Sequence, residues 1–209
     1  MSKLPRDRRL GIARGVLSIV LALALVACDE HAGSPSTPPR FVSTDITGVG
    51  WGRDFHLTDQ TGKPRSLADF KGKVVMLYFG YTHCPDQCPT TMAEMAGVRS
   101  KLGESGRRVQ GLFVTVDPRR DTPQVLAQYV SAFDPSFLGL YGDESTTSAL
   151  AKEFKFYYSA QKADAHGNYS VDHGSAIYVF DPTGRLRLLM NPEMSVDAMA
   201  ADVGLLLKE

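Results

Sequence analysis

The chain alternates short apolar runs, which are typical of buried strands, with segments whose apolar residues recur at helical spacing. Two runs, KVVMLYFGY (73–81) and RVQGLFVTV (108–116), are nearly continuous in apolar residues and rich in β-formers. They predict central strands that are buried on both faces. A helical stripe lies between them in residues 90–102, formed by Met92, Met95, Val98 and Leu102.

Turn and capping residues delimit the other predicted elements. Thr122 and Pro123 place an N-cap residue before a proline at the first helical position, which predicts a helix that ends near Ser131. Ser195 likewise caps a last helix that ends near Leu207. The pattern also predicts extended segments at 55–67, 137–141, 155–159, 175–180 and 185–190, and a helix at 145–154.

This order of elements predicts an α/β fold. Strands that alternate with helices form a mainly parallel sheet with helices on its faces, and the hairpin of 175–190 adds an antiparallel edge. The order of these elements resembles the thioredoxin-like fold: a strand, two cysteines and a helix, followed later by a hairpin and a helix. We expect a central mixed sheet flanked by helices, with a strand and a helix inserted near 137–154 and a C-terminal hairpin plus helix.

The first 27 residues predict a lipoprotein signal peptide. Basic residues dominate up to Arg14, and the apolar run Val16–Ala27 has twelve residues. A permanent membrane-spanning helix needs roughly 20. The run ends at LVAC, which resembles the bacterial lipoprotein box, in which Cys28 becomes the lipidated first residue of the mature protein. Asp29 resembles the signal that retains lipoproteins on the inner membrane, and an uncleaved signal anchor is the alternative.

A polar linker separates this segment from the folded domain. Residues 28–40, rich in Pro, Ser and Thr, predict a flexible tether, and the domain is expected at 41–209. Removal of residues 1–27 would leave 18 basic and 22 acidic residues, which gives no basic excess for binding nucleic acid. With Cys28 lipidated, Cys84 and Cys88 would be the remaining thiols, in a compartment where disulfides persist.

Cys84 and Cys88 are the main candidates for chemistry. They follow the most apolar strand and precede a helix, and functional groups of open α/β sheets collect at the carboxyl ends of strands. The pair could be a redox couple, a metal clamp or a structural disulfide, but a disulfide across so short a loop stabilises little. Redox enzymes of this fold have two intervening residues. This pair has three, which favours metal binding without excluding redox chemistry.

The position of Pro89 determines where we expect the helix to begin. A helix that began at Pro85 would carry Pro89 in its interior, at a cost of about 3 kcal/mol. We therefore expect Pro89 at the first helical position, with Cys88 at the helix entrance and the CPDQC segment in a loop. The positive end of the helix would lower the pKa of a nearby thiol and favour the thiolate.

His173 is the candidate third ligand. Two thiolates form a soft site for Cu(I) or zinc, and an imidazole suits copper and zinc as well. His173 precedes a predicted strand, where thioredoxin-like proteins usually have a cis-proline facing the two cysteines, and no proline occurs here. His83 adjoins Cys84 but points in another direction on an extended backbone, so we expect it beside the ligands. We expect solvated or packing roles for His31, His56 and His166.

Three segments together resemble the Sco/SenC family of copper-binding thioredoxin-fold proteins: FGYTHCPDQCPTTM, TVDPRRDTPQVLAQYV and VDHGSAIYVFDPTGRL. The likeness runs from about residue 45 to 207. The resemblance implies that Cys84, Cys88 and His173 bind a copper ion. Asp117 belongs to the family pattern and is expected either near the metal or simply in the turn before Pro118.

The resemblance also implies a function. Members of the family deliver copper to the binuclear copper centre of cytochrome c oxidase subunit II, and some reduce the cysteines of that centre. We expect a copper metallochaperone, lipid-anchored to the bacterial inner membrane and facing the periplasm, that serves subunit II or another copper-site acceptor. The alternatives are a thiol–disulfide oxidoreductase that needs Cys84 and Cys88 but not His173, a thiol peroxidase, and a sensor of copper or redox state.

Overall fold

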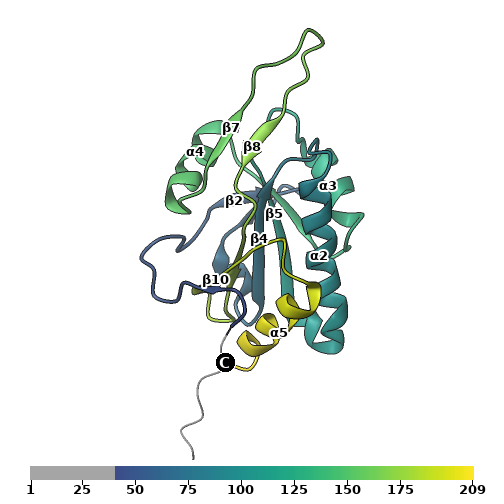
Figure 1. Ribbon diagram of the computed structural model, residues 1–209. Coiled ribbons are helices and arrows are strands. Elements are labelled where there is room, and N and C mark those ends of the chain that lie inside the picture. Colours follow the sequence, from purple (N-terminus) through teal and green to yellow (C-terminus); the bar gives the residue numbers. More distant parts are fainter. Residues whose placement is uncertain (1–40) are drawn as a thin grey trace, which may run out of the picture. The chain divides into compact units, whose positions relative to one another are not determined.

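The computed structural model describes residues 41–209, which form one large sheet, a smaller one and the helices that cover them (Figure 1). The predicted signal peptide, the tether and Cys28 lie outside the described residues. The eight-stranded sheet has the order β1-β10-β9-β4-β5-β6-β2-β3. Its strands are β1 (Thr44–Asp45), β2 (Leu57–Asp59), β3 (Pro64–Arg65), β4 (Val74–Gly80), β5 (Val109–Thr115), β6 (Leu138–Tyr141), β9 (Ile177–Phe180) and β10 (Leu186–Met190).

Two helices begin at the capping residues that the sequence predicts, and the helix predicted at 145–154 begins one residue earlier, after Asp143. The Thr122 side chain accepts the N–H of Val125, and the Ser195 side chain accepts the N–H of Ala198. No helix within residues 41–209 is long and apolar enough to cross a membrane. The helices are η1 (Leu67–Phe70), α2 (Gln87–Lys101), η2 (Gly103–Arg108), α3 (Pro123–Ser131), α4 (Glu144–Glu153) and α5 (Val196–Leu206).

The sheet is mixed, as expected. β4 pairs in parallel with β5 and antiparallel with β9, and β5 pairs in parallel with β6. Every residue of β4 and β5 is buried, which agrees with their continuous apolar pattern. The inserted strand and helix are β6 and α4, and the C-terminal hairpin and helix are β9–β10 and α5. The predicted thioredoxin-like arrangement is therefore confirmed.

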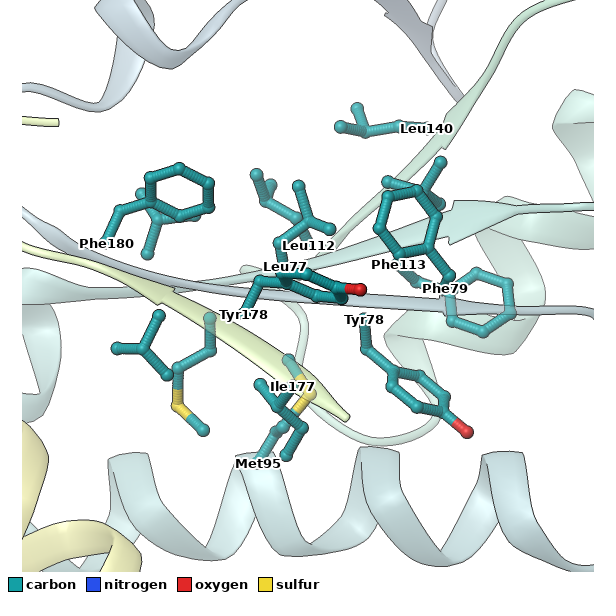
Figure 2. Packing of buried hydrophobic residues seen from close by; sticks show 14 of the residues in the cluster. Leu77, Tyr78, Phe79, Met95, Leu112, Phe113, Leu140, Ile177, Tyr178 and Phe180 are labelled. Atoms are coloured by element: carbon teal, nitrogen blue, oxygen red, sulfur yellow. The ribbon is translucent and has the colours of Figure 1, made fainter. Parts of the chain in front are cut away.

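Neighbouring residues of β4 build the core on opposite faces of the sheet. Figure 2 shows the Tyr78 side chain on the face where Met95 of α2 lies, and Phe79 on the other face. On the second face the Phe79 ring stacks on Phe156, with 4.4 Å between ring centroids, and meets Phe154 edge-on. The face that carries Tyr78 is therefore the one against α2, which carries Cys88.

The segment 155–159 differs from its prediction as an edge strand. β7 (Tyr158–Ala160) pairs antiparallel with β8 (Val171–His173) in a separate two-stranded sheet. The two strands pair because the chain turns back through residues 161–170, where the N–H of Gln161 donates to the carbonyl of Ser170. Figure 1 shows this β7–β8 hairpin extending beyond the end of the large sheet.

The start of α2 also differs from its prediction. The helix begins at Gln87 with Asp86 as its N-cap, so Pro89 is the third helical residue and Cys88 already lies in the first turn. The first four N–H groups of a helix have no partner within it, so a proline at this position removes no hydrogen bond. Placing Pro89 at the first helical position was therefore wrong by two residues.

The first described residues are fixed on α5. The carboxylate of Asp202, which is buried, accepts the backbone N–H of Val42 at 3.0 Å and that of Ser43 at 2.7 Å. In Figure 1 this part of the chain lies beside the C-terminus, at the end of the large sheet opposite the β7–β8 hairpin.

Candidate metal centre

Cys84 and Cys88 lie beyond the carboxyl end of β4, as predicted from the strand order. Cys84 lies in the loop before α2, and its sulfur accepts the backbone N–H of Cys88 at 3.4 Å. Both thiols are free. Cys84 is half-buried, whereas Cys88 has no exposed surface. The two sulfurs are therefore close together but differ in their access to solvent.

His173 reaches the two cysteines from the last position of β8. Its Nε2 lies 3.4 Å from Sγ of Cys88, and its Nδ1 lies 2.7 Å from the carbonyl oxygen of Gly174. A carbonyl only accepts, so Nδ1 carries the proton and Nε2 is left free to bind a metal. The two sulfurs and one ring nitrogen of His173 all lie within 4.8 Å of one another. Two soft sulfurs and an imidazole are a donor set that suits copper or zinc.

Aromatic rings surround the imidazole of His173. The rings of Tyr78, Tyr81 and Phe156 lie with their centroids 6.1, 5.9 and 6.3 Å from that of the imidazole. Burial among these rings lowers the pKa of His173, and the hydrogen bond to Gly174 opposes this effect. The imidazole is therefore held neutral, which is the form that binds metal.

The environment of Cys88 corrects the expectation that the helix start favours its thiolate. Burial raises the pKa of the Cys88 thiol to about 12. This effect of burial outweighs the backbone hydrogen bond and the hydroxyl of Tyr78, both of which lower the pKa by stabilising the thiolate. That hydroxyl lies 3.8 Å from the sulfur, and burial raises the pKa of Tyr78 as well. Without a metal the buried sulfur is a thiol, so a bound cation must displace its proton.

Gly80 leaves room for the sulfur of Cys88. A Cβ atom added to Gly80 would lie 2.9 Å from Sγ of Cys88 and 2.8 Å from Cε2 of Phe113. Both distances are too short for unstrained carbon contacts. The last residue of β4 is thus small because the sulfur and the Phe113 ring occupy the space beside it.

His83 lies at the rim of the site, outside the group of three ligands. Its side chain is 52% exposed, and its Nδ1 lies 3.2 Å from Oγ1 of Thr82 and 3.7 Å from Oδ1 of Asp121. Asp121 itself is buried and accepts the N–H and hydroxyl of Thr82 and the hydroxyl of Thr115. It ties the loop that carries Cys84 to the end of β5. Sequence reasoning missed this carboxylate, although it lies in the VDPRRDTP segment.

Asp117, the other residue expected beside the metal, faces the β7–β8 hairpin. Its carboxylate accepts the hydroxyl of Tyr169 at 2.8 Å and pairs with the guanidinium of Arg120. Arg120 in turn lies over the ring of Tyr81, with 5.6 Å to the ring centroid. Asp117 is thus connected to His173 through other side chains rather than by direct contact with the three ligand atoms.

A thioredoxin-like sheet with two cysteines after its central strand and a histidine opposite them defines a class of thioredoxin-fold proteins with a candidate metal site. Within that class, the chain belongs to the SCO1/SenC family, whose family model matches residues 45–208.

Relatives support the same placement. The chain is 46% identical over 138 residues to the mitochondrial SCO2 homolog of Bos taurus. The match covers 65% of this chain and 52% of the relative. The chain thus spans about half the length of the curated relatives it matches. The structure of ScoI from Bradyrhizobium japonicum with copper bound has 37% identity and a TM-score of 0.67, and the match covers 72% of this chain and 96% of that one. Apo Sco1 from Thermus thermophilus has 38% identity and a TM-score of 0.69, with 79% and 95% covered.

Proposed function

We propose that this protein binds one copper ion through Cys84, Cys88 and His173 and passes it to a copper-site acceptor, with cytochrome c oxidase subunit II as the expected acceptor. The observation that carries the proposal is the convergence of two sulfurs and one imidazole nitrogen within 4.8 Å. Two relatives, from Bradyrhizobium japonicum and Arabidopsis thaliana, have been determined with copper bound. The Sco family is a family of cytochrome c oxidase assembly proteins.

The chemistry of the three ligands suits transfer rather than storage. Thiolates hold Cu(I) well, and a half-buried sulfur such as Cys84 leaves the ion reachable by the thiolates of an acceptor. Copper then moves by ligand exchange, with each new bond formed as an old one is released. Oxidation of Cys84 and Cys88 to a disulfide removes both thiolates, so metal binding and the redox state of the pair are linked.

The domain would be held at a membrane. A lipid on Cys28 and a tether of residues 28–40 would hold the domain at the outer face of the bacterial inner membrane. Confinement to the membrane raises the effective concentration of a membrane-bound acceptor. The attachment of Val42 and Ser43 to α5 is compatible with this arrangement, because it fixes the first described residues at the end of the large sheet opposite the β7–β8 hairpin.

Copper binding by single-site variants tests the proposal. The affinity of the reduced protein for Cu(I) is measured by competition with a chelator for the wild type, His173→Ala and His166→Ala. His166 is exposed in the loop of the same hairpin and serves as the matched control. We expect His173→Ala to lose at least about 100-fold in affinity, because it removes a ligand, and His166→Ala to bind as the wild type does. Equal affinities for all three proteins would sink the three-ligand proposal.

A second candidate function is thiol–disulfide exchange with the cysteines of the same acceptor. The observation that favours it is the pair of free thiols, one buried and one half-buried, close together beyond the end of β4. In this reaction the acceptor disulfide gains two electrons and two protons, and Cys84 and Cys88 form a disulfide. Reduction of a disulfide peptide at equal rates by wild type and His173→Ala, without copper, would favour this function.

A further inference from the structure

The ligand histidine lies at the base of a hairpin that is not packed flush against the domain. His173 is the last residue of β8 and pairs with Tyr158 of β7. A cavity of about 450 Å³ separates the hairpin from the domain, and residues of both line it. The lining includes Val116, Asp117, Thr147, Tyr158, Tyr169 and Val171. Specific contacts must therefore hold the hairpin at the angle that brings His173 to the cysteines.

Tyr169 makes three such contacts, four residues before His173. Its hydroxyl donates to Oδ1 of Asp117 at 2.8 Å, and its backbone carbonyl accepts Nη1 of Arg120 at 2.8 Å. The guanidinium carbon of Arg120 also lies 3.6 Å from the centroid of the Tyr169 ring. Tyr169 of the hairpin is thus bound to Asp117 and Arg120 through its ring, its hydroxyl and its backbone.

Tyr169, Asp117 and Arg120 together form a clamp between the hairpin and the domain. Its second half, Asp117 and Arg120, is fixed to the domain. The N–H of Asp117 donates to the hydroxyl of Thr115 at 2.9 Å, and the Asp117 carboxylate pairs with Arg120. The side chains of Asp117 and Arg120 are 4% and 21% exposed, so solvent screens their interaction less than that of a surface pair. Arg120 also covers Tyr81, whose ring meets the imidazole of His173 edge-on.

We propose that Arg120 and Tyr169 are positioning residues for His173: they hold the β7–β8 hairpin so that Nε2 stays within reach of the Cys88 sulfur. The inference rests on the proposed copper binding and adds to it. Cys84 and Cys88 belong to the loop and helix after β4, whereas His173 belongs to the hairpin. The clamp therefore sets whether a bound copper ion has two or three protein ligands.

A cycle of double variants tests the inference. Arg120→Lys keeps the charge but loses the planar fork, and Tyr169→Phe keeps the ring but loses the hydroxyl. Each is made in the wild type and in His173→Ala, and Cu(I) affinity is measured for the reduced protein. We expect each variant to lower the affinity about tenfold when His173 is present and to have no effect when it is absent. Arg119→Lys is the matched control, since Arg119 is exposed and pairs with Glu144 instead.

X-ray absorption of the Cu(I) protein provides a readout that lost stability alone does not change. Scattering from the imidazole should weaken in Arg120→Lys and Tyr169→Phe and persist in Arg119→Lys. Unchanged affinity, or an equal loss in both backgrounds, overturns the inference while leaving the copper site in place. If His173→Ala itself binds copper as the wild type does, the proposed function fails instead, so the two failures are distinguishable.

Discussion

The sulfur of Cys88 lies 3.4 Å from Nε2 of His173, although 85 positions of sequence separate them. The register of the sheet produces this contact. Tyr78, near the end of β4, pairs antiparallel with Ile177, at the start of β9. The segment that leads into β9 therefore arrives where β4 ends, and His173 meets the cysteines that follow β4. The metal centre thus depends on the pairing of β4 with β9 as much as on the ligands themselves.

Enlarging Gly80 should disturb the centre through contact with Cys88. The methyl group of Gly80→Ala would lie 2.9 Å from the sulfur and 2.8 Å from the Phe113 ring, so both must shift. We expect a loss of about 1–3 kcal/mol in the free energy of unfolding, measured with denaturant, and a weaker Cu(I) affinity.

Gly204→Ala is the matched control for this variant. A Cβ atom at Gly204, within α5, would meet Leu102 at an ordinary 3.6 Å, so this variant should gain stability of up to about 1 kcal/mol and keep its copper affinity. Wild-type stability and affinity in Gly80→Ala would show that the sulfur has more freedom than these distances imply.

Removing the hydroxyl of Tyr78 should change the electronic properties of a bound copper ion more than the stability of the fold. The hydroxyl lies 3.8 Å from Sγ of Cys88 and donates toward it, which reduces the electron density that the sulfur gives to the metal. In Tyr78→Phe we expect a Cu(II) charge-transfer band at lower energy, a lower Cu(II)/Cu(I) potential, and a stability change within about 1 kcal/mol.

Tyr129→Phe separates this effect from the loss of any buried hydroxyl. The Tyr129 hydroxyl is buried and has no hydrogen-bond partner within residues 41–209, so its removal should leave both the band and the potential unchanged. Identical spectra for Tyr78→Phe and the wild type would argue against a hydrogen bond to the sulfur.

Neutralising Asp121 should loosen the loop that carries Cys84. In Asp121→Asn one carboxylate oxygen becomes an amide that cannot accept from Thr82 or Thr115, which leaves buried donors without partners. We expect a loss of about 1–3 kcal/mol in the free energy of unfolding and a weaker Cu(I) affinity.

Asp86→Asn is the control for the change of charge. Asp86 is exposed in the same loop and makes no side-chain hydrogen bond at the helix start, so its variant should resemble the wild type in stability and affinity. Equal effects of the two variants would mean that charge near the site, and not the anchoring by Asp121, determines the affinity.

Acid should weaken the fold in part through Asp59. Burial alone would raise the pKa of this carboxyl, but hydrogen bonds from Thr61 and Arg65 outweigh it and hold the pKa at about 2. Because the unfolded value is about 3.9, protonation favours the unfolded chain. The contribution of Asp59 is therefore complete above about pH 4 and is lost as the pH falls toward 2.

Denaturant unfolding between pH 2 and pH 6 measures this contribution. Asp59→Asn should be less stable at pH 6 and should show a shallower loss of stability on acidification. Asp197→Asn, which changes an exposed carboxyl paired with Lys101, should retain the wild-type profile. Parallel profiles for Asp59→Asn and the wild type would contradict the lowered pKa.

The elements that the sequence predicts correctly are those with strong local signals. The apolar runs of β4 and β5, the caps Thr122 and Ser195, and the hairpin β9–β10 each carry their own pattern. The pairing of β7 with β8 could not be predicted in this way, because two three-residue strands that pair only with each other leave almost no pattern. The start of α2 was misplaced because Pro89 was assigned to the only helical position where proline is favoured, although the whole first turn tolerates it.

The three predicted ligands come together in the structure, but most of the residues that support them were missed. Tyr78 lies inside an apolar run, where its pattern is that of a core residue, and its hydroxyl acquires a role only once Cys88 is placed beside it. Arg120 and Tyr169 are 49 positions apart, and each alone has the pattern of a surface residue. Such roles arise from tertiary contacts, which a single sequence does not reveal.

Cys84 and Cys88 differ in exposure, so they differ in how early an approaching molecule can contact them. A molecule that approaches from solvent reaches the sulfur of Cys84 before that of Cys88, which has no exposed surface. The proposed exchange with a partner, whether of a metal ion or of a disulfide, would therefore begin at Cys84. The inner sulfur would act after the outer one, so burial alone would give the proposed exchange a direction.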